Sequence, residues 1–208
     1  MNNYFSTLNQ MISSGFEAQV PEPNIRKIIL SALEVFSRKS VEGTKIKDIA
    51  QYAGFSQGYI YNYFSSKEEL FTKMVELTSE GGVKAIIYAD SLTISPFQKL
   101  CTLATVMTDL SSLSVQHFRL LLMIICSPDS ISERAKTLNS KTGISSIEAL
   151  SKIITAGQQS GEIIDGNPIT LSITFFSIVH GLLLLKLQSK DISLFPNIED
   201  LLGLMLKK

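Results

Sequence analysis

Residues 57–63 combine two amide side chains with three tyrosines and a glycine. Glutamine and asparagine can pair with adenine in the major groove of DNA, and tyrosine hydroxyls can bond phosphate oxygens. At helical spacing Ile60 and Phe64 share one side, so the polar groups would face outward. We predict DNA contacts from Ser56, Gln57, Gly58, Tyr59, Tyr61, Asn62 and Tyr63. For the tyrosines alone, a half-buried structural role is an equally good interpretation.

The residues before this segment predict the rest of a helix-turn-helix. Thr44 is expected to cap a first helix in which apolar and small residues recur on one face. Gly54 suits a left-handed turn, and Ser56 is expected to cap a second helix that runs to about Phe64. Such a pair of helices lays its second helix in the major groove.

Flanking helices complete a three-helix head in this interpretation. An amphipathic helix is expected to begin at a capping Asn24 and to end at Arg38 and Lys39. Ser65 and Glu68 have the spacing of a capping box for the next helix. Lys67 in its first turn opposes the helix dipole, which a phosphate partner would rationalise, although a solvated surface lysine explains it equally simply.

The run from 26 to 70 resembles the TetR family of bacterial transcription regulators. The matching residues are Ala32, Phe36, Thr44, Ile49-Ala50, Ala53-Gly54-Phe55-Ser56, Gly58, Ile60-Tyr61, Phe64, Lys67 and Glu68-Glu69-Leu70. The glycine that is usual in the family after the first helix is replaced by the run 38–43, RKSVEG. By matching position, the resemblance implies phosphate contacts from Thr44, Tyr61, Tyr63 and Lys67. It implies base contacts from Gln57, Gly58, Tyr59 and Tyr61, and Asn62 stands where the family varies.

Charge and composition are consistent with a DNA-binding head on a neutral protein. The chain has 208 residues and zero net charge, which argues against a general nucleic-acid-coating protein. Residues 24–67 hold seven Lys/Arg and three acidic residues, a net of +4, which confines the basic surface to one part. Without a signal peptide the chain is expected to be cytoplasmic.

Catalytic and metal-binding patterns are missing from the sequence. There is no GxGxxG, P-loop or HExxH motif, so an enzyme is not expected. The two histidines, His117 and His180, have no partner at metal-ligand spacing, and no metal or cofactor is predicted. Cys101 and Cys126 lie in apolar helical patterns and are expected to be buried, reduced thiols.

The fold is predicted to be all-α, with an arm at 1–23, the helix-turn-helix domain at 24–67 and a helical ligand-binding and dimerisation domain at 68–208. Periodicity and breaks place further helices at 66–88, 95–111, 114–126, 129–160, 167–188 and 197–206. The segment 129–160 has a candidate break at 142–143. The arm is expected to be loosely ordered or partly helical.

The uncharged segment 169–185 is nearly long enough to span a bilayer, but a buried helix explains it better. It carries a stripe of small residues beside an apolar stripe, and the last helix also has an excess of apolar residues. Together they predict a two-fold homodimer joined as a four-helix bundle, as the resemblance also implies. The interface residues are expected to be Thr174, Ile178, Gly181, Leu182, Leu185, Leu201, Leu202 and Met205.

The resemblance further implies that a small molecule binds in the C-terminal bundle and repositions the heads. Met and aromatic residues there would suit an apolar or amphipathic molecule, and they are Met107, Phe118, Leu122, Phe175, Phe176 and His180. The predicted function is a dimeric repressor that binds a palindromic operator in double-stranded DNA and is released by that molecule. An activator and a helical interaction protein are the alternatives.

Overall fold

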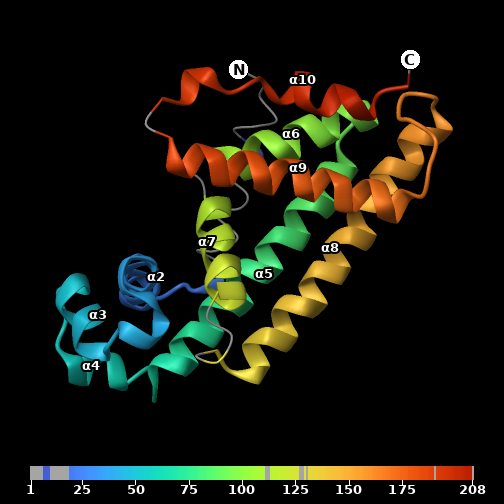
Figure 1. Ribbon diagram of the computed structural model, residues 1–208. Helices are drawn as coiled ribbons and strands as arrows, with labels where there is room; N and C mark the ends of the chain where they lie inside the picture. Colours follow the sequence, from blue (N-terminus) through green and yellow to red (C-terminus); the bar gives the residue numbers. More distant parts are fainter. Residues whose placement is uncertain are drawn as a thin grey trace. The chain divides into compact units, whose positions relative to one another are not determined.

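The computed structural model describes residues 7–9, 19–110, 113–126, 129, 131–189 and 191–207, and it is built of helices (Figure 1). Within these ranges the only extended pairing is an isolated antiparallel bridge between Ile163 and Leu206. The predicted all-α class is therefore confirmed. By their contacts the residues form two compact units, and α5 (Lys67–Ser91), α7 (Leu113–Cys126) and α8 (Glu133–Gln159) contribute to both.

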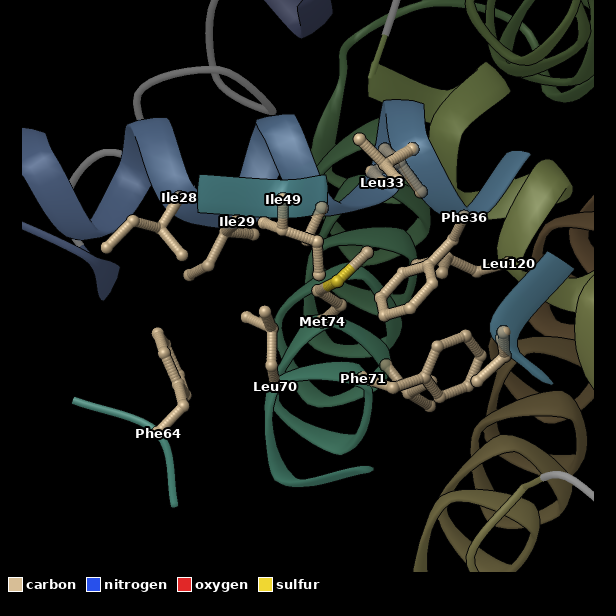
Figure 2. Close-up of a cluster of buried hydrophobic side chains, with 14 of the residues drawn as sticks. Ile28, Ile29, Leu33, Phe36, Ile49, Phe64, Leu70, Phe71, Met74 and Leu120 are labelled. Carbon is tan, nitrogen blue, oxygen red and sulfur yellow. The ribbon is translucent and has the colours of Figure 1, made fainter. Parts of the chain in front are cut away.

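One unit comprises residues 13–81 and 116–142. It holds α2 (Pro23–Gly43), α3 (Ile46–Ala53) and α4 (Gln57–Tyr61), together with parts of α5, α7 and α8. Its core surrounds an edge-to-face pair, Phe36 and Phe71, whose ring centroids lie 5.6 Å apart. Leu120 of α7 packs into the same cluster (Figure 2). The core of the head therefore includes residues that lie far beyond it in the sequence.

The N-cap of helix α2 lies two residues earlier than expected, and the helix contains a break. Glu22 rather than Asn24 is the N-cap, and its carboxylate accepts the backbone N–H groups of Asn24 and Ile25 at 3.1 and 2.6 Å. The regular helix stops after Lys39, as predicted, because Ser40 has φ 62° and ψ 167°. A short final turn then leads to Gly43.

The turn between α3 and α4 follows the prediction. Gly54 ends α3 with φ 72°, and the Ser56 hydroxyl accepts the backbone N–H of Tyr59 at 3.1 Å. Helix α4 ends at Tyr61, three residues earlier than expected, and Phe64 closes the following turn with an N–H to the Ile60 carbonyl at 3.0 Å. This tighter turn still directs Phe64 into the core, where it is 6% exposed.

Two predicted caps are wrong in detail. The Thr44 hydroxyl donates to the Ser40 carbonyl at 2.6 Å instead of accepting an N–H of α3, whose first turn is closed by Asp48 accepting the Lys45 N–H at 2.9 Å. At the start of α5 the capping hydroxyl belongs to Ser66, which accepts the N–H of Glu69 at 3.0 Å. Both shifts move the cap by one residue, which is the usual uncertainty of helix ends.

The other unit comprises residues 1–12, 82–115 and 143–208. It holds α6 (Pro96–Thr108), α9 (Pro168–Gln188), α10 (Ile198–Leu202) and the 3₁₀ turns η2 (Ile192–Leu194) and η3 (Gly203–Met205). Its core contains Phe175, Leu150 and Ile153, and Leu8 of the arm is fully buried in it. Helix α8 is continuous, so the expected break at 142–143 does not occur.

The two cysteines differ in their surroundings. Cys101 is buried, and burial raises the pKa of its thiol to about 12, with nearby Glu199 and Glu162 acting in the same direction. Cys126 is exposed, so its predicted burial is wrong. The apolar sequence around Cys126 explains the error, because periodicity does not show which side of a helix is covered.

Candidate nucleic-acid interface

Helix α4 presents a polar outer face held by an apolar inner one. Ile60 is fully buried, whereas Gln57, Gly58, Tyr61 and Asn62 are exposed. A Cβ atom added to Gly58 would meet no atom within 4 Å, so nothing within the protein requires a glycine there. The predicted orientation of the helix is therefore correct, and these four residues can meet a groove of DNA without rearrangement.

Tyr59 and Tyr63 are tied to other parts of the head. The Tyr59 hydroxyl accepts hydrogen bonds from Asn24 Nδ2 at 3.1 Å and from the Tyr63 hydroxyl at 3.2 Å. The Tyr59 ring stacks on Phe55 with centroids 4.8 Å apart. The hydrogen bond to Tyr59, followed by burial, raises the pKa of Tyr63, so its phenol stays protonated at neutral pH. These contacts fix the angle of α4 against α2, which is the structural role left open for the tyrosines.

Lys67 occupies a different position from the one expected of a phosphate contact. Its Nζ donates to the carbonyl groups of Val41, Glu42 and Thr44 at 2.8, 3.2 and 3.2 Å. An ammonium has three N–H donors, so all are used within the protein. The carbonyl groups at the end of α2, rather than a polyanion, explain the cation in the first turn of α5.

Thr44 is likewise turned inward. Its side chain is 1% exposed and its hydroxyl is engaged with Ser40. In this conformation neither Thr44 nor Lys67 offers a free donor to DNA. Both contribute instead to the junction between α2 and α3.

Cations that the sequence pattern did not single out lie exposed on the head. Lys27 stands 5.0 Å from the centroid of the Phe55 ring, beside the turn that precedes α4. Lys45 and Lys47 are exposed at the start of α3, and within the described ranges neither amine pairs with a carboxylate. Arg38 and Lys39, in contrast, pair with Glu34 at 2.7 Å and Asp48 at 3.1 Å. The net charge of the segment was the only sequence signal for these lysines.

Comparisons with known proteins identify the head. Residues 28–74 match the family described as bacterial regulatory proteins, tetR family. Over these residues the chain is similar to this family. It is 40% identical over 60 residues to the HTH-type transcriptional regulator YfiR of Bacillus subtilis, covering 29% of each chain. It is 34% identical over 67 residues to the HTH-type transcriptional repressor NicS of Pseudomonas putida, covering 32% of each.

The matches to these curated relatives span about three-tenths of their length. The whole chain is similar in fold to a TetR family transcriptional regulator from Agrobacterium tumefaciens, with a TM-score of 0.74, 18% identity and coverage of 89% and 99% of the two chains. At that identity the likeness shows the fold alone. Beyond the head, the roles of individual residues follow from their own surroundings in the structure.

The residues predicted for a TetR-type dimer interface divide into two groups. Thr174, Gly181 and Leu185 are exposed on α9, and Ile178 and Leu201 are half-buried. Leu182, Leu202 and Met205 are buried in their own unit, so α10 gives less surface to a partner than expected. Helix α9 has the length and composition of a membrane span, with a mean hydropathy of 1.9 and 28% of that window buried.

The predicted ligand residues also fall in two groups. Met107, Phe175, Phe176 and His180 lie in the unit that contains α9, and Phe118 and Leu122 lie in the unit that contains the head. Phe175 is fully buried, whereas Met107, Phe176 and His180 are half-buried, and the Phe176 and His180 rings lie 5.8 Å apart. Among the described residues no cluster of metal-ligating side chains occurs. The side chain of His117 lies outside the described residues.

Proposed function

We propose that this chain is a dimeric repressor that binds a palindromic site in double-stranded DNA through α4. The observation that carries the proposal is the exposed face of Gln57, Gly58, Tyr61 and Asn62 within a head of the tetR family. Gln57 and Asn62 supply amides for base edges, and the Gly58 backbone is open to close approach. Tyr59 and Tyr63 hold α4 at its angle and support this face rather than extend it.

Phosphate contacts are assigned to lysines near this face. Lys27, Lys45 and Lys47 are exposed cations, and none of them is ion-paired with another described residue, so no such pair has to break before it meets a phosphate. Each phosphate that a lysine neutralises releases counterions, so the affinity for DNA should fall steeply with salt. Lys67 and Thr44 instead stabilise the junction between α2 and α3.

The dimer is proposed to form through the exposed face of α9. The face carries Ile173 and Leu185, which are 50% and 55% exposed, with small residues between them. The hydroxyl groups of Thr174 and Ser177 donate to carbonyls of their own helix at 2.9 and 2.8 Å, so a partner need not desolvate free donors. Small side chains with satisfied hydroxyls allow two copies of α9 to approach closely about a two-fold axis.

The function is tested by selecting bound sequences from a pool of random duplexes across a salt series. An enriched palindrome with two half-sites about one helical turn apart supports the proposal. Weak binding that is blind to sequence, in the presence and absence of cell-extract metabolites, would contradict it and favour a helical interaction protein.

Two alanine variants show whether α4 makes the contact. Gly58→Ala should leave the fold intact, since its Cβ meets open space, but should weaken binding to the selected site because the backbone can no longer approach. Gly143→Ala is the matched control, since its Cβ also meets nothing within 4 Å and it lies in α8, outside the helix-turn-helix. Equal affinity of the two variants would remove α4 from the interface.

The dimer is tested separately with a pair of lysine substitutions. Ile173→Lys should produce monomers in analytical ultracentrifugation, because it places a charge on the shared α9 face. Ile144→Lys on α8 is the control at similar exposure, 57% against 50%. Dissociation of both variants, or of neither, would exclude α9 as the interface.

Release by a small molecule completes the proposed function. Half-buried Met107, Phe176 and His180 offer apolar and aromatic surface in the unit that contains α9. A ligand that favours one conformer of the heads would change DNA affinity by a shift of populations. The measurement is the release of the selected duplex from the protein when a small molecule that binds the protein is added.

A further inference from the structure

Lys186 occupies a position on α9 where an apolar residue is expected. Phe175, Val179 and Leu182 point into the core of their unit and are at most 6% exposed. Seven residues after Val179 the helix returns to nearly the same direction, and the residue there is Lys186. Its side chain is half-buried, so a charged group extends from the apolar face of the helix.

The ammonium of Lys186 has little to bind within the described part of the chain. Its Nζ lies 3.5 Å from the Thr108 hydroxyl, at the end of α6, and that hydroxyl already donates to the Ala104 carbonyl at 2.9 Å. The neighbouring Asp109 accepts Asn9 Nδ2 at 3.1 Å. Burial lowers the pKa of Lys186, and the attraction of Asp109 opposes this only in part.

An ammonium has three N–H donors, and Lys186 makes one long hydrogen bond within the described residues, so two donors have no protein acceptor there. An anionic oxygen would satisfy them, since hydrogen bonds between charged groups are among the strongest in proteins. This arrangement suits a ligand site better than a permanent structural contact, because a structural lysine would have its own protein acceptors, as Lys67 does.

Apolar surface continues from this charge along the same helix. Leu183 is buried, and Phe176 and His180 are half-buried with their rings in contact. Met107, also half-buried, immediately precedes Thr108 on α6. From Phe176 to Lys186 the helix rises about 15 Å, which is the scale of a small amphipathic molecule.

We propose that Lys186 binds the carboxylate of an acidic amphipathic ligand whose apolar part lies along Met107, Phe176 and His180. The inference rests on the proposed function in one respect, that this ligand is the effector. It narrows the expected class from apolar or amphipathic molecules in general to organic acids.

The test is calorimetric binding of hexanoate, decanoate and 2-naphthoate to the full chain, with 1-decanol as the uncharged probe. At least one acid should bind at one site per chain. Lys186→Met should weaken that acid by about tenfold to hundredfold, as expected for loss of a hydrogen bond to a charged group. Binding of 1-decanol should be unchanged.

Two further variants separate the charge of Lys186 from its packing. Lys186→Arg should retain most of the affinity, and Lys152→Met, which removes an exposed lysine from α8, should behave as wild type. Lys186→Met should also melt higher than wild type without ligand, because an apolar group relieves the cost of burial. Equal loss of acid and alcohol in Lys186→Met, or no saturable binding of any acid to the wild type, would overturn the proposal.

The same preparations show which proposal has failed, if one does. Selection of a palindromic duplex by a protein that binds none of the acids would refute the ligand class and leave the repressor function standing. Acid binding that depends on Lys186, in a protein that selects no duplex, would refute the repressor function and leave the site standing.

Discussion

Ser40→Gly should stabilise the head, because Ser40 has a backbone conformation that glycine adopts without strain. At φ 62° and ψ 167° a residue with a Cβ atom carries about 1–3 kcal/mol of strain. Two losses oppose the gain. Glycine adds about 0.5–1 kcal/mol of freedom to the unfolded chain. The Ser40 hydroxyl, which accepts the Gly43 N–H at 3.2 Å, is worth only a few tenths of a kcal/mol relative to glycine. The net gain in the free energy of unfolding is about 1 kcal/mol.

Urea unfolding followed by circular dichroism measures this change, and thermal melting should rise by about 2–4 °C per kcal/mol for a chain of this size. Ser40→Ala is expected to have the opposite sign, since it retains the Cβ and loses the hydrogen bond. Ser37→Gly, on the exposed side of the regular part of α2, should cost about 0.5 kcal/mol. If Ser40→Gly destabilises as much as Ser37→Gly, α2 continues regularly through residue 40 and the reasoning is refuted.

Three further results follow from the same structure. Lys67→Met should lower the free energy of unfolding by about 1–3 kcal/mol, because it removes the donor that three carbonyl groups share. Lys47→Met should retain stability and weaken DNA binding with a shallower salt dependence. The reverse pattern in urea and binding titrations would restore Lys67 as a phosphate contact. The hydroxyl and the backbone N–H of Ser65 both donate hydrogen bonds to the Glu69 carboxylate, and these bonds lower the pKa of Glu69 below its usual 4.5. The contribution of Glu69 to stability is therefore complete above the unfolded pKa and is lost as pH falls through the lower folded pKa. Glu69→Gln should consequently flatten the acid side of a plot of unfolding free energy against pH. An unchanged plot would contradict this. Native protein at about pH 8 should react with a thiol reagent at exposed Cys126 and not at buried Cys101, while denatured protein reacts at both; two fast native thiols would show that Cys101 is accessible.

The parts of the head that sequence predicted correctly depend on neighbours in the chain. Gly54 ends α3 and Ser56 begins α4 because a left-handed residue and a capping hydroxyl act within a few residues. Ile60 and Phe64 turn inward because helical spacing puts apolar groups on one side. Local propensity and periodicity are sufficient for such features.

The contacts that the sequence did not predict involve partners that lie far away in the chain. Lys67 binds carbonyl groups 23 to 26 residues earlier, and no pattern around Lys67 shows that the chain returns there. The hydroxyl of Tyr59 is engaged by Asn24, 35 residues before it. Leu120 joins the core of the head from α7, although its spacing suits any buried face equally well. Residue type predicts that such groups need partners but does not choose among the partners.

The three tyrosines of residues 57–63 therefore have two different roles. Tyr59 and Tyr63 are hydrogen-bonded to each other, and Tyr59 is hydrogen-bonded to Asn24 of α2, so we expect a substitution at either position to alter the angle of α4 as well as its surface. Tyr61 is 47% exposed and has no such bond among the described residues. Specificity changes made at Gln57, Tyr61 or Asn62 can consequently be interpreted as changes in contact. Those made at Tyr59 must first be separated from a movement of the helix, for which Tyr59→Phe, lacking only the hydroxyl, is the appropriate variant.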